Sequence, residues 1–148
     1  MFKIDRSKVR AAVKITLADT IGQADLAFRI AIEKPQYEWN GDTLRQNGTL
    51  VSSPRNIVDS GYLKNTQIYG AIDDFHYQFR WGADYAALNH EGGWSFFNGI
   101  KYYHNPRPWT QYGIKGDATA PIRYQYPNAE LDIPFYFARH FKLYARSY

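Results

Sequence analysis

The sequence predicts an α+β fold, in which a long N-terminal helix and a C-terminal helix pack on a small antiparallel sheet and a hairpin or loop protrudes. Three observations lead to this fold: helical periodicity over residues 5–34, alternation of aromatic and polar residues over 75–81, and a capped amphipathic segment at 132–146. The chain has 148 residues. Because one core suffices for a chain of this length, residues 1–148 are expected to form a single domain.

The N-terminal helix carries two apolar stripes on nearly opposite faces. Val9, Val13, Leu17, Thr20, Ala24, Phe28 and Ala31 form the first, and Pro35 ends the helix. The second stripe consists of Ala11, Ile15, Ala18, Gly22, Leu26 and Ile30. Two interpretations of the second stripe stay open: it is buried by another part of the same chain, or it packs on a neighbouring subunit.

Residues 36–61 are rich in turn formers and predict a surface excursion. Asn40-Gly41 and Asn47-Gly48 are dipeptides typical of hairpin turns. After them, Asp59 is expected to cap a short helical turn over 61–65, because its carboxylate can accept hydrogen bonds from free backbone N–H groups.

Residues 62–105 are expected to hold the sheet and a short helix. Residues 67–72 and 75–81 are expected to pair as strands around a tight turn at Asp73-Asp74. The segment 83–91 then indicates a short helix ended by Gly92-Gly93, and a further strand is expected at 99–104.

Residues 106–131 are expected to form an aromatic, proline-rich loop, followed by a helix over 132–146 with Asp132 as N-cap and Pro134 in its first turn. Aromatic residues make up 18% of the chain. That share exceeds what the core of one small domain needs, and tyrosine and tryptophan are favoured at protein interfaces. The aromatic members of the candidate subunit interface are Trp94, Phe96, Phe97, Tyr102, Tyr103 and Tyr112.

Positive charge is concentrated at the two ends of the chain, whose formal net charge is +4. These residues are the candidates for contact with DNA or with an acidic partner: Lys3, Arg6, Lys8, Arg10, Lys14, Arg139, Lys142 and Arg146. An autonomous nucleic-acid-binding module that uses these termini, with tyrosines for stacking, therefore stays open as an alternative.

Several classes of function find no support in the sequence. The chain has no cysteine, and its four histidines are scattered without metal-ligand spacing. No phosphate-binding glycine-rich loop or Gly-x-Ser-x-Gly motif occurs. We therefore expect no enzyme, no cofactor and no metal. No secretory signal or membrane span is evident either, so the chain is expected to be made in the cytoplasm without a membrane partner.

Three segments, in order and with their spacing, resemble one protein family. They are Ser53-Pro-Arg-Asn-Ile-Val-Asp-Ser-Gly-Tyr-Leu-Lys-Asn-Thr-Gln67, Trp81-Gly-Ala-Asp-Tyr-Ala-Ala-Leu-Asn-His-Glu-Gly-Gly93 and Pro106-Arg-Pro-Trp-Thr110. Tyr37-Glu-Trp39 with Arg45-Gln-Asn-Gly48 also matches. Together they are similar to the small neck or tail-completion proteins of long-tailed double-stranded DNA phages. The chain departs from the family pattern at Ser60, where threonine is commoner, and in the long interval between Trp109 and the last helix.

The resemblance implies a structural protein of the virion. It implies a ring of six copies around the DNA channel, acting in head–tail joining or as a tail terminator, assembled in the host cytoplasm beside neck, portal-side or tail-tube proteins. The motif residues are expected to be scaffold: Asp59, Gly61, Leu63, Tyr85, Ala86, Glu91, Gly92, Pro108 and Trp109. A glycan hydrolase using Asp74 and Glu91 is the least favoured alternative.

Overall fold

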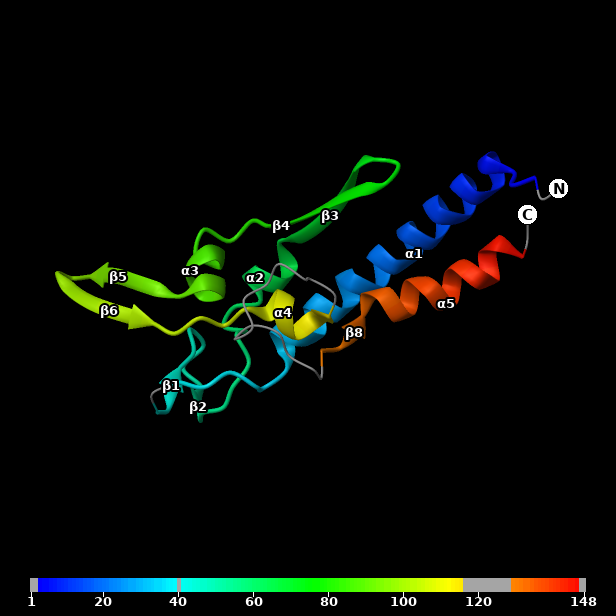
Figure 1. The fold of residues 1–148 in the computed structure, drawn as a ribbon. Coiled ribbons are helices and arrows are strands. Elements are labelled where there is room, and N and C mark those ends of the chain that lie inside the picture. Colours follow the sequence, from blue (N-terminus) through cyan, green and yellow to red (C-terminus); the bar gives the residue numbers. More distant parts are fainter. Residues whose placement is uncertain (1–2, 40, 116–128, 147–148) are drawn as a thin grey trace.

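The computed structural model describes residues 3–39, 41–115 and 129–146, and it confirms the α+β class with a long N-terminal and a C-terminal helix. Helix α1 spans Arg6–Glu33 and α5 spans Ile133–Ala145 (Figure 1). Asp5 caps α1, and Asp132 caps α5 by accepting a hydrogen bond from the N–H of Phe135. Both ends of α5 therefore fall within one residue of their predicted positions.

The predicted first stripe of α1 is confirmed in its C-terminal half, at Thr20, Ala24, Phe28 and Ala31, but toward the N-terminus the buried face shifts to Ala12 and Thr16. Ala12, Thr16, Thr20 and Ala24 are buried, whereas Val9 is 43% exposed. Each buried threonine hydroxyl donates to the carbonyl oxygen four residues earlier in the helix, so it needs no outside partner. These small side chains allow a neighbouring helix to approach closely.

That neighbour is α5, which runs antiparallel to α1 at its side (Figure 1). Tyr136 and Tyr144 of α5 each donate a hydrogen bond to the Asp19 carboxylate, with oxygen–oxygen distances of 3.0 and 3.1 Å. The two phenols and one carboxylate thus clamp the C-terminal helix onto the middle of α1.

The clamp predicts that α5 loosens at alkaline pH. Burial and the Asp19 hydrogen bond raise the pKa of Tyr136 above 10, and the Asp19 hydrogen bond raises that of Tyr144. Since the protonated phenols are favoured in the folded state, their stabilisation is present below about pH 10 and is lost as the pH rises through the folded pKa values. We expect the melting temperature of the protein to fall as the pH rises above 10, with a smaller fall in the control Tyr136→Phe/Tyr144→Phe.

The strands form separate two-stranded sheets rather than the single sheet expected. Strand β3 (Gln67–Asp73) pairs antiparallel with β4 (His76–Trp81), and β5 (Gly93–Phe97) with β6 (Ile100–His104). The turn between these strands lies at Asp74-Phe75, one residue later than the predicted Asp73-Asp74, because Asp73 still pairs with His76 in the ladder. The sheets stay apart because α3 (Ala86–Glu91) lies between β4 and β5 in the chain and the second hairpin points away from the first (Figure 1).

The shorter elements lie around these hairpins. A small hairpin of β1 (Thr43–Leu44) and β2 (Leu50–Val51) forms the protruding excursion, with its turn at Gly48. The segment predicted as an aromatic loop contains α4 (Trp109–Gly113) and β7 (Ile114–Lys115), which pairs in parallel with β8 (Leu131–Asp132). Within that segment, residues 116–128 lie outside the described residues.

The core lies at the C-terminal end of α1. Ala31, Ile32, Tyr37, Ile57, Leu63, Ala83 and Trp109 are buried together there. Phe28 continues the core toward β4, where its ring meets those of Phe79 and Trp81 at centroid distances of 4.8 and 5.6 Å. The alternating aromatic residues of 75–81 are thus confirmed as the inward face of that strand.

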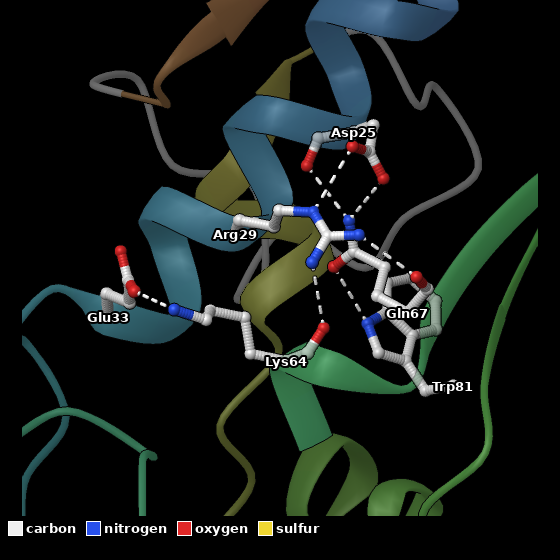
Figure 2. Close-up of polar contacts among 6 residues, drawn as sticks. All are labelled: Asp25, Arg29, Glu33, Lys64, Gln67 and Trp81. Atoms are coloured by element: carbon white, nitrogen blue, oxygen red, sulfur yellow. Dashed lines mark hydrogen bonds and ion pairs between the residues drawn. The ribbon is translucent and has the colours of Figure 1, made fainter. Parts of the chain in front are cut away.

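A polar network holds β3 on α1 (Figure 2). The buried Gln67 amide donates to the Asp25 backbone carbonyl and carboxylate, and its oxygen accepts from the Trp81 indole N–H at 3.0 Å. Arg29 donates to the backbone carbonyl oxygens of Lys64 and Gln67 while pairing with Asp25. Buried polar groups are costly unless they are bonded, so this network fixes the register of the hairpin on the helix.

Asp59 does not cap the short helix α2 (Tyr62–Asn65), which corrects the prediction. Its carboxylate instead accepts from the N–H of Gln46 at 2.7 Å, and so fastens the β1–β2 excursion. The N-cap of α2 is Gly61, which adopts the left-handed conformation at φ +82°, and the Ser60 hydroxyl accepts from the N–H of Tyr62.

Among the helices that the structure describes, none is long and apolar enough to cross a membrane.

Candidate functional site

The β5–β6 hairpin carries the most prominent exposed aromatic surface. Trp94 is 57% exposed, Phe96 72% and Tyr103 56%. In the antiparallel register Trp94 lies opposite Tyr103, and Phe96 lies opposite Lys101, so these four side chains share one face. The Lys101 ammonium sits 4.3 Å from the centre of the Trp94 ring. We call these four residues the aromatic hairpin face.

The hairpin stands away from the body of the protein (Figure 1). Among the described elements, its extensive contacts are those between its own two strands. An isolated two-stranded hairpin is marginally stable in water, and none of the described strands pairs with either of its edges. Contact with a partner would therefore stabilise this hairpin.

The second stripe of α1 is uncovered in the single chain. Ile15 is 39% exposed, Leu26 51% and Ile30 38%, and Ala18 is exposed too. Ala11 and Gly22 are half-buried, and Tyr69 of β3 lies near Gly22. Within the described residues the stripe is thus not buried between the hairpin and another segment.

Other members of the predicted interface lie elsewhere. Tyr102 is exposed on the opposite face of the hairpin, next to Ser95. The side chain of Phe97 lies outside the described residues. Tyr112, by contrast, is half-buried and packs edge-on against the core residue Tyr37 at 5.1 Å, so it supports the core rather than a free surface.

The two basic segments are brought together by the antiparallel pairing of α1 and α5. The start of α1 and the end of α5 lie at the same end of the molecule (Figure 1). Exposed cations lie on both helices and on the residues beside them: Lys3, Arg6, Lys8, Arg10, Lys14, Arg139, Lys142 and Arg146. Lys14 also pairs with Asp74 at 3.2 Å, and Arg10 lies over the Phe75 ring, which ties the tip of the β3–β4 hairpin to this end.

A groove of about 380 Å³ lies between β4 and α3. It is lined by Phe79, Arg80, Trp81, Ala86, Ala87, His90, Glu91 and the buried Trp109. The Glu91 side chain is 65% exposed. The groove is therefore lined by aromatic and small apolar side chains together with an arginine, a histidine and a carboxylate.

The Thr110 hydroxyl, the His90 imidazole and the Glu91 carboxylate follow one another in a chain of contacts at this groove. His90 contacts the Thr110 hydroxyl through Nε2 and the Glu91 carboxylate through Nδ1, each at 2.6 Å. This order resembles a nucleophile–base–acid arrangement. Thr110 does not line the groove, however, so its hydroxyl is not presented where a substrate would sit. The contacts instead join α3 to α4.

The carboxylates considered for glycan hydrolysis are not brought together as a pair. Asp74 is at the tip of the β3–β4 hairpin with Lys14, whereas Glu91 ends α3 beside the groove. No group of three or more potential metal-ligating side chains occurs among residues 3–39, 41–115 and 129–146.

The motif residues lie mainly in or around the core. Leu63, Pro108 and Trp109 are buried, Ala86 is half-buried, and Tyr85 is 38% exposed. Asp59 and Glu91 are exposed. Gly61 and Gly92 supply positive φ angles of +82° and +74°. Most of these positions have a structural role at the meeting point of α1, α3 and α4.

Sequence reasoning missed a cluster of arginines around Trp39. Arg107 and Arg55 place their guanidinium carbons 3.6 and 4.6 Å from the centre of the Trp39 ring. Both arginines are buried, and burial beside Arg55 lowers the pKa of Arg107 to about 10. The three residues come from three different motif segments. Their places within the motif segments were the available signal for this cluster. Stacking between distant segments leaves no periodicity in the sequence, so the cluster itself could not be predicted.

The chain was compared with protein-family models, with curated proteins and with solved structures, and none matched.

Proposed function

We propose that this protein is a structural subunit of a phage virion, which forms a six-membered ring around the DNA channel in head–tail joining or as a tail terminator. The ring, the copy number and the place in the virion come from the motif resemblance. The single observation in the structure that supports assembly is the aromatic hairpin face, which no other described element covers.

Self-association follows from the physical properties of that face. Exposed aromatic clusters are uncommon on monomeric surfaces and supply most of the binding energy at interfaces. The uncovered α1 stripe gives the molecule a second apolar surface, distinct from the first. Two different surfaces of this kind allow a head-to-tail contact, and such contacts close into rings when the rotation between subunits permits.

The basic end of the molecule supports a channel that DNA passes through. The basic segments that include the start of α1 and the end of α5 lie at one end, far from the aromatic hairpin (Figure 1). In a ring, that end would face the lumen or an acidic neighbour such as a portal-side or tail-tube protein. Contacts of this sort with phosphates are independent of base sequence.

Native mass spectrometry of the purified chain tests the proposal. The expected result is a species of six subunits, because a closed ring satisfies every head-to-tail interface. Phe96→Ala is expected to shift the population toward monomers, whereas Leu44→Ala, which removes an equally exposed apolar side chain from β1, should not. A chain that stays monomeric at high concentration would contradict the proposal.

A nucleic-acid-binding module is the second candidate, and the gathering of both basic segments at one end favours it. Binding of a short DNA duplex across a salt series separates the two functions. Tight binding by the monomer with a steep salt dependence is expected of the module. Weak binding by the monomer, gained only after assembly, is expected of the ring.

A further inference from the structure

We propose that the aromatic hairpin face of one subunit docks into the β4–α3 groove of a second copy of this chain, with Phe96 in the groove and Lys101 paired with Glu91. This inference rests on the proposed assembly and names the contact that would build it. The occupant is a second copy because the hairpin offers an exposed aromatic ring to the aromatic residues of the groove and a cation to the Glu91 carboxylate at its edge.

The groove has the size and lining of an aromatic receptor. A cavity of about 150 Å³ accommodates a benzene ring, so the groove of about 380 Å³ has room for the Phe96 ring and part of a neighbouring ring. Phe79, Trp81 and Trp109 line it and offer ring faces and edges. Phe96 is the most exposed aromatic side chain of the hairpin face, at 72%.

One pair of opposite charges, Lys101 and Glu91, connects the two surfaces, in a groove that Arg80 and His90 also line. Residues 93–104 contain no carboxylate, and Lys101 is the cation that lies directly opposite Phe96 in the strand register. Glu91, at the edge of the groove, has a carboxylate that is 65% exposed. When Phe96 enters the groove, the neighbouring Lys101 ammonium reaches this rim. Pairs of opposite charge at an interface rim set register and suppress wrong partners.

A subunit does not fill its own groove with its own hairpin. Strand β5 begins at Gly93, two residues after Glu91, and runs away from α3 (Figure 1). Roughly 10 Å of strand separates Gly93 from Phe96 at about 3.3 Å per residue. The tip of the hairpin therefore extends beyond the groove from which it starts, which leaves the groove open to another copy.

A charge exchange tests the pairing in the full chain. Lys101→Glu and Glu91→Lys are each expected to weaken assembly about tenfold or more, because each places like charges together. The double variant Lys101→Glu/Glu91→Lys is expected to recover most of that loss. Both side chains are exposed, but Glu91 also contacts His90, so circular dichroism and thermal melting check that each variant is folded before assembly is compared. Loss in each single variant without recovery in the double variant would overturn the pairing.

Disulfide cross-linking gives a second measurement, and the absence of cysteine from the chain makes it specific. The variant Glu91→Cys/Lys101→Cys should give a covalent ladder of multimers on oxidation, whereas each single-cysteine variant should not. A disulfide within one chain is excluded by the separation along the hairpin, because the two Cα atoms must approach within about 7 Å. No ladder from a chain that forms rings would overturn the docking mode.

The outcomes also separate this inference from the proposed function. If the parent chain forms rings that stay unchanged in Lys101→Glu, in Glu91→Lys, in Phe96→Ala and in Ala87→Trp, which fills the groove, the docking mode is wrong. The proposal that the protein forms a ring then still stands. If the parent chain forms no assembly, the proposed function fails first.

Discussion

Replacing Gly92 with alanine is expected to lower the free energy of unfolding by about 3–5 kcal/mol, one of the two largest effects of a single substitution that we predict. Gly92 adopts φ +74° and ψ −175°, a region that is almost closed to other residues. A Cβ atom there would lie 2.7 Å from the carbonyl oxygen of His104 and 2.8 Å from the nitrogen of Pro106. Both atoms belong to the backbone, so they cannot turn away.

Gly99→Ala is the matched control for this prediction. Gly99 has nearly the same φ, +76°, but no heavy atom lies within 4 Å of its Cβ position. Its replacement is expected to cost only the backbone strain, about 1–2 kcal/mol. Urea denaturation at a fixed, low protein concentration measures both variants. Equal losses in the two would show that the close approach of β6 to Gly92 does not matter.

Trp109→Ala is expected to cost about 3–5 kcal/mol as well, for a different reason. Trp109 is 1% exposed and packs edge-on against Trp81 at 5.5 Å and His90 at 4.7 Å. Removing its indole leaves a cavity where α3, α4 and β4 meet. The surrounding helices are short and joined by turns, so they can move toward the cavity. The aromatic rings around the site prevent them from filling it completely.

Trp94→Ala makes the same chemical change at an exposed position. Since Trp94 is 57% exposed on the hairpin, the stability of the monomer is expected to change by about 0.5 kcal/mol or less. Assembly, in contrast, should weaken. Thermal melting and native mass spectrometry of the two variants therefore separate folding from association. A folding defect in Trp94→Ala as large as that of Trp109→Ala would show that the hairpin is part of the core.

The helices and the β3–β4 hairpin could be predicted because their signals are local. Asp132 and Pro134 mark the start of α5 within one residue, and alternation over 75–81 identifies the inward face of β4. The order of elements along the chain followed from these signals. The shift of the buried face to Ala12 and Thr16 in the N-terminal half of α1 did not, because these small residues are buried there by α5 rather than by their own hydrophobicity.

Strand β5 and the role of Asp59 illustrate what local signals miss. Trp94-Ser-Phe-Phe97 has no strict alternation, and only its pairing with β6 makes it a strand. Asp59 is placed well to cap α2, but a hydrogen bond to Gln46, thirteen residues earlier in the chain, takes its carboxylate. Contacts between distant segments, such as Arg55 and Arg107 on Trp39, have no counterpart in local sequence patterns.

The candidate surfaces were predicted in part. Aromatic excess led to Trp94, Phe96 and Tyr103, which are exposed, but also to Tyr112, which packs on the core. Counting aromatics cannot distinguish these, because the same residue types fill cores and interfaces. The groove that receives the hairpin was missed entirely, since Phe79, Trp81 and Glu91 come together only when α3 folds against β4.

Electron-microscope imaging of the purified chain is the most direct test of the central claim that this protein is a ring-forming subunit. The expected result is rings with sixfold symmetry and a central channel, which are lost in Phe96→Ala and in Lys101→Glu. Rings are expected to return when Lys101→Glu is combined with Glu91→Lys. Single small particles at every concentration, from a chain that is folded by circular dichroism, would contradict the claim.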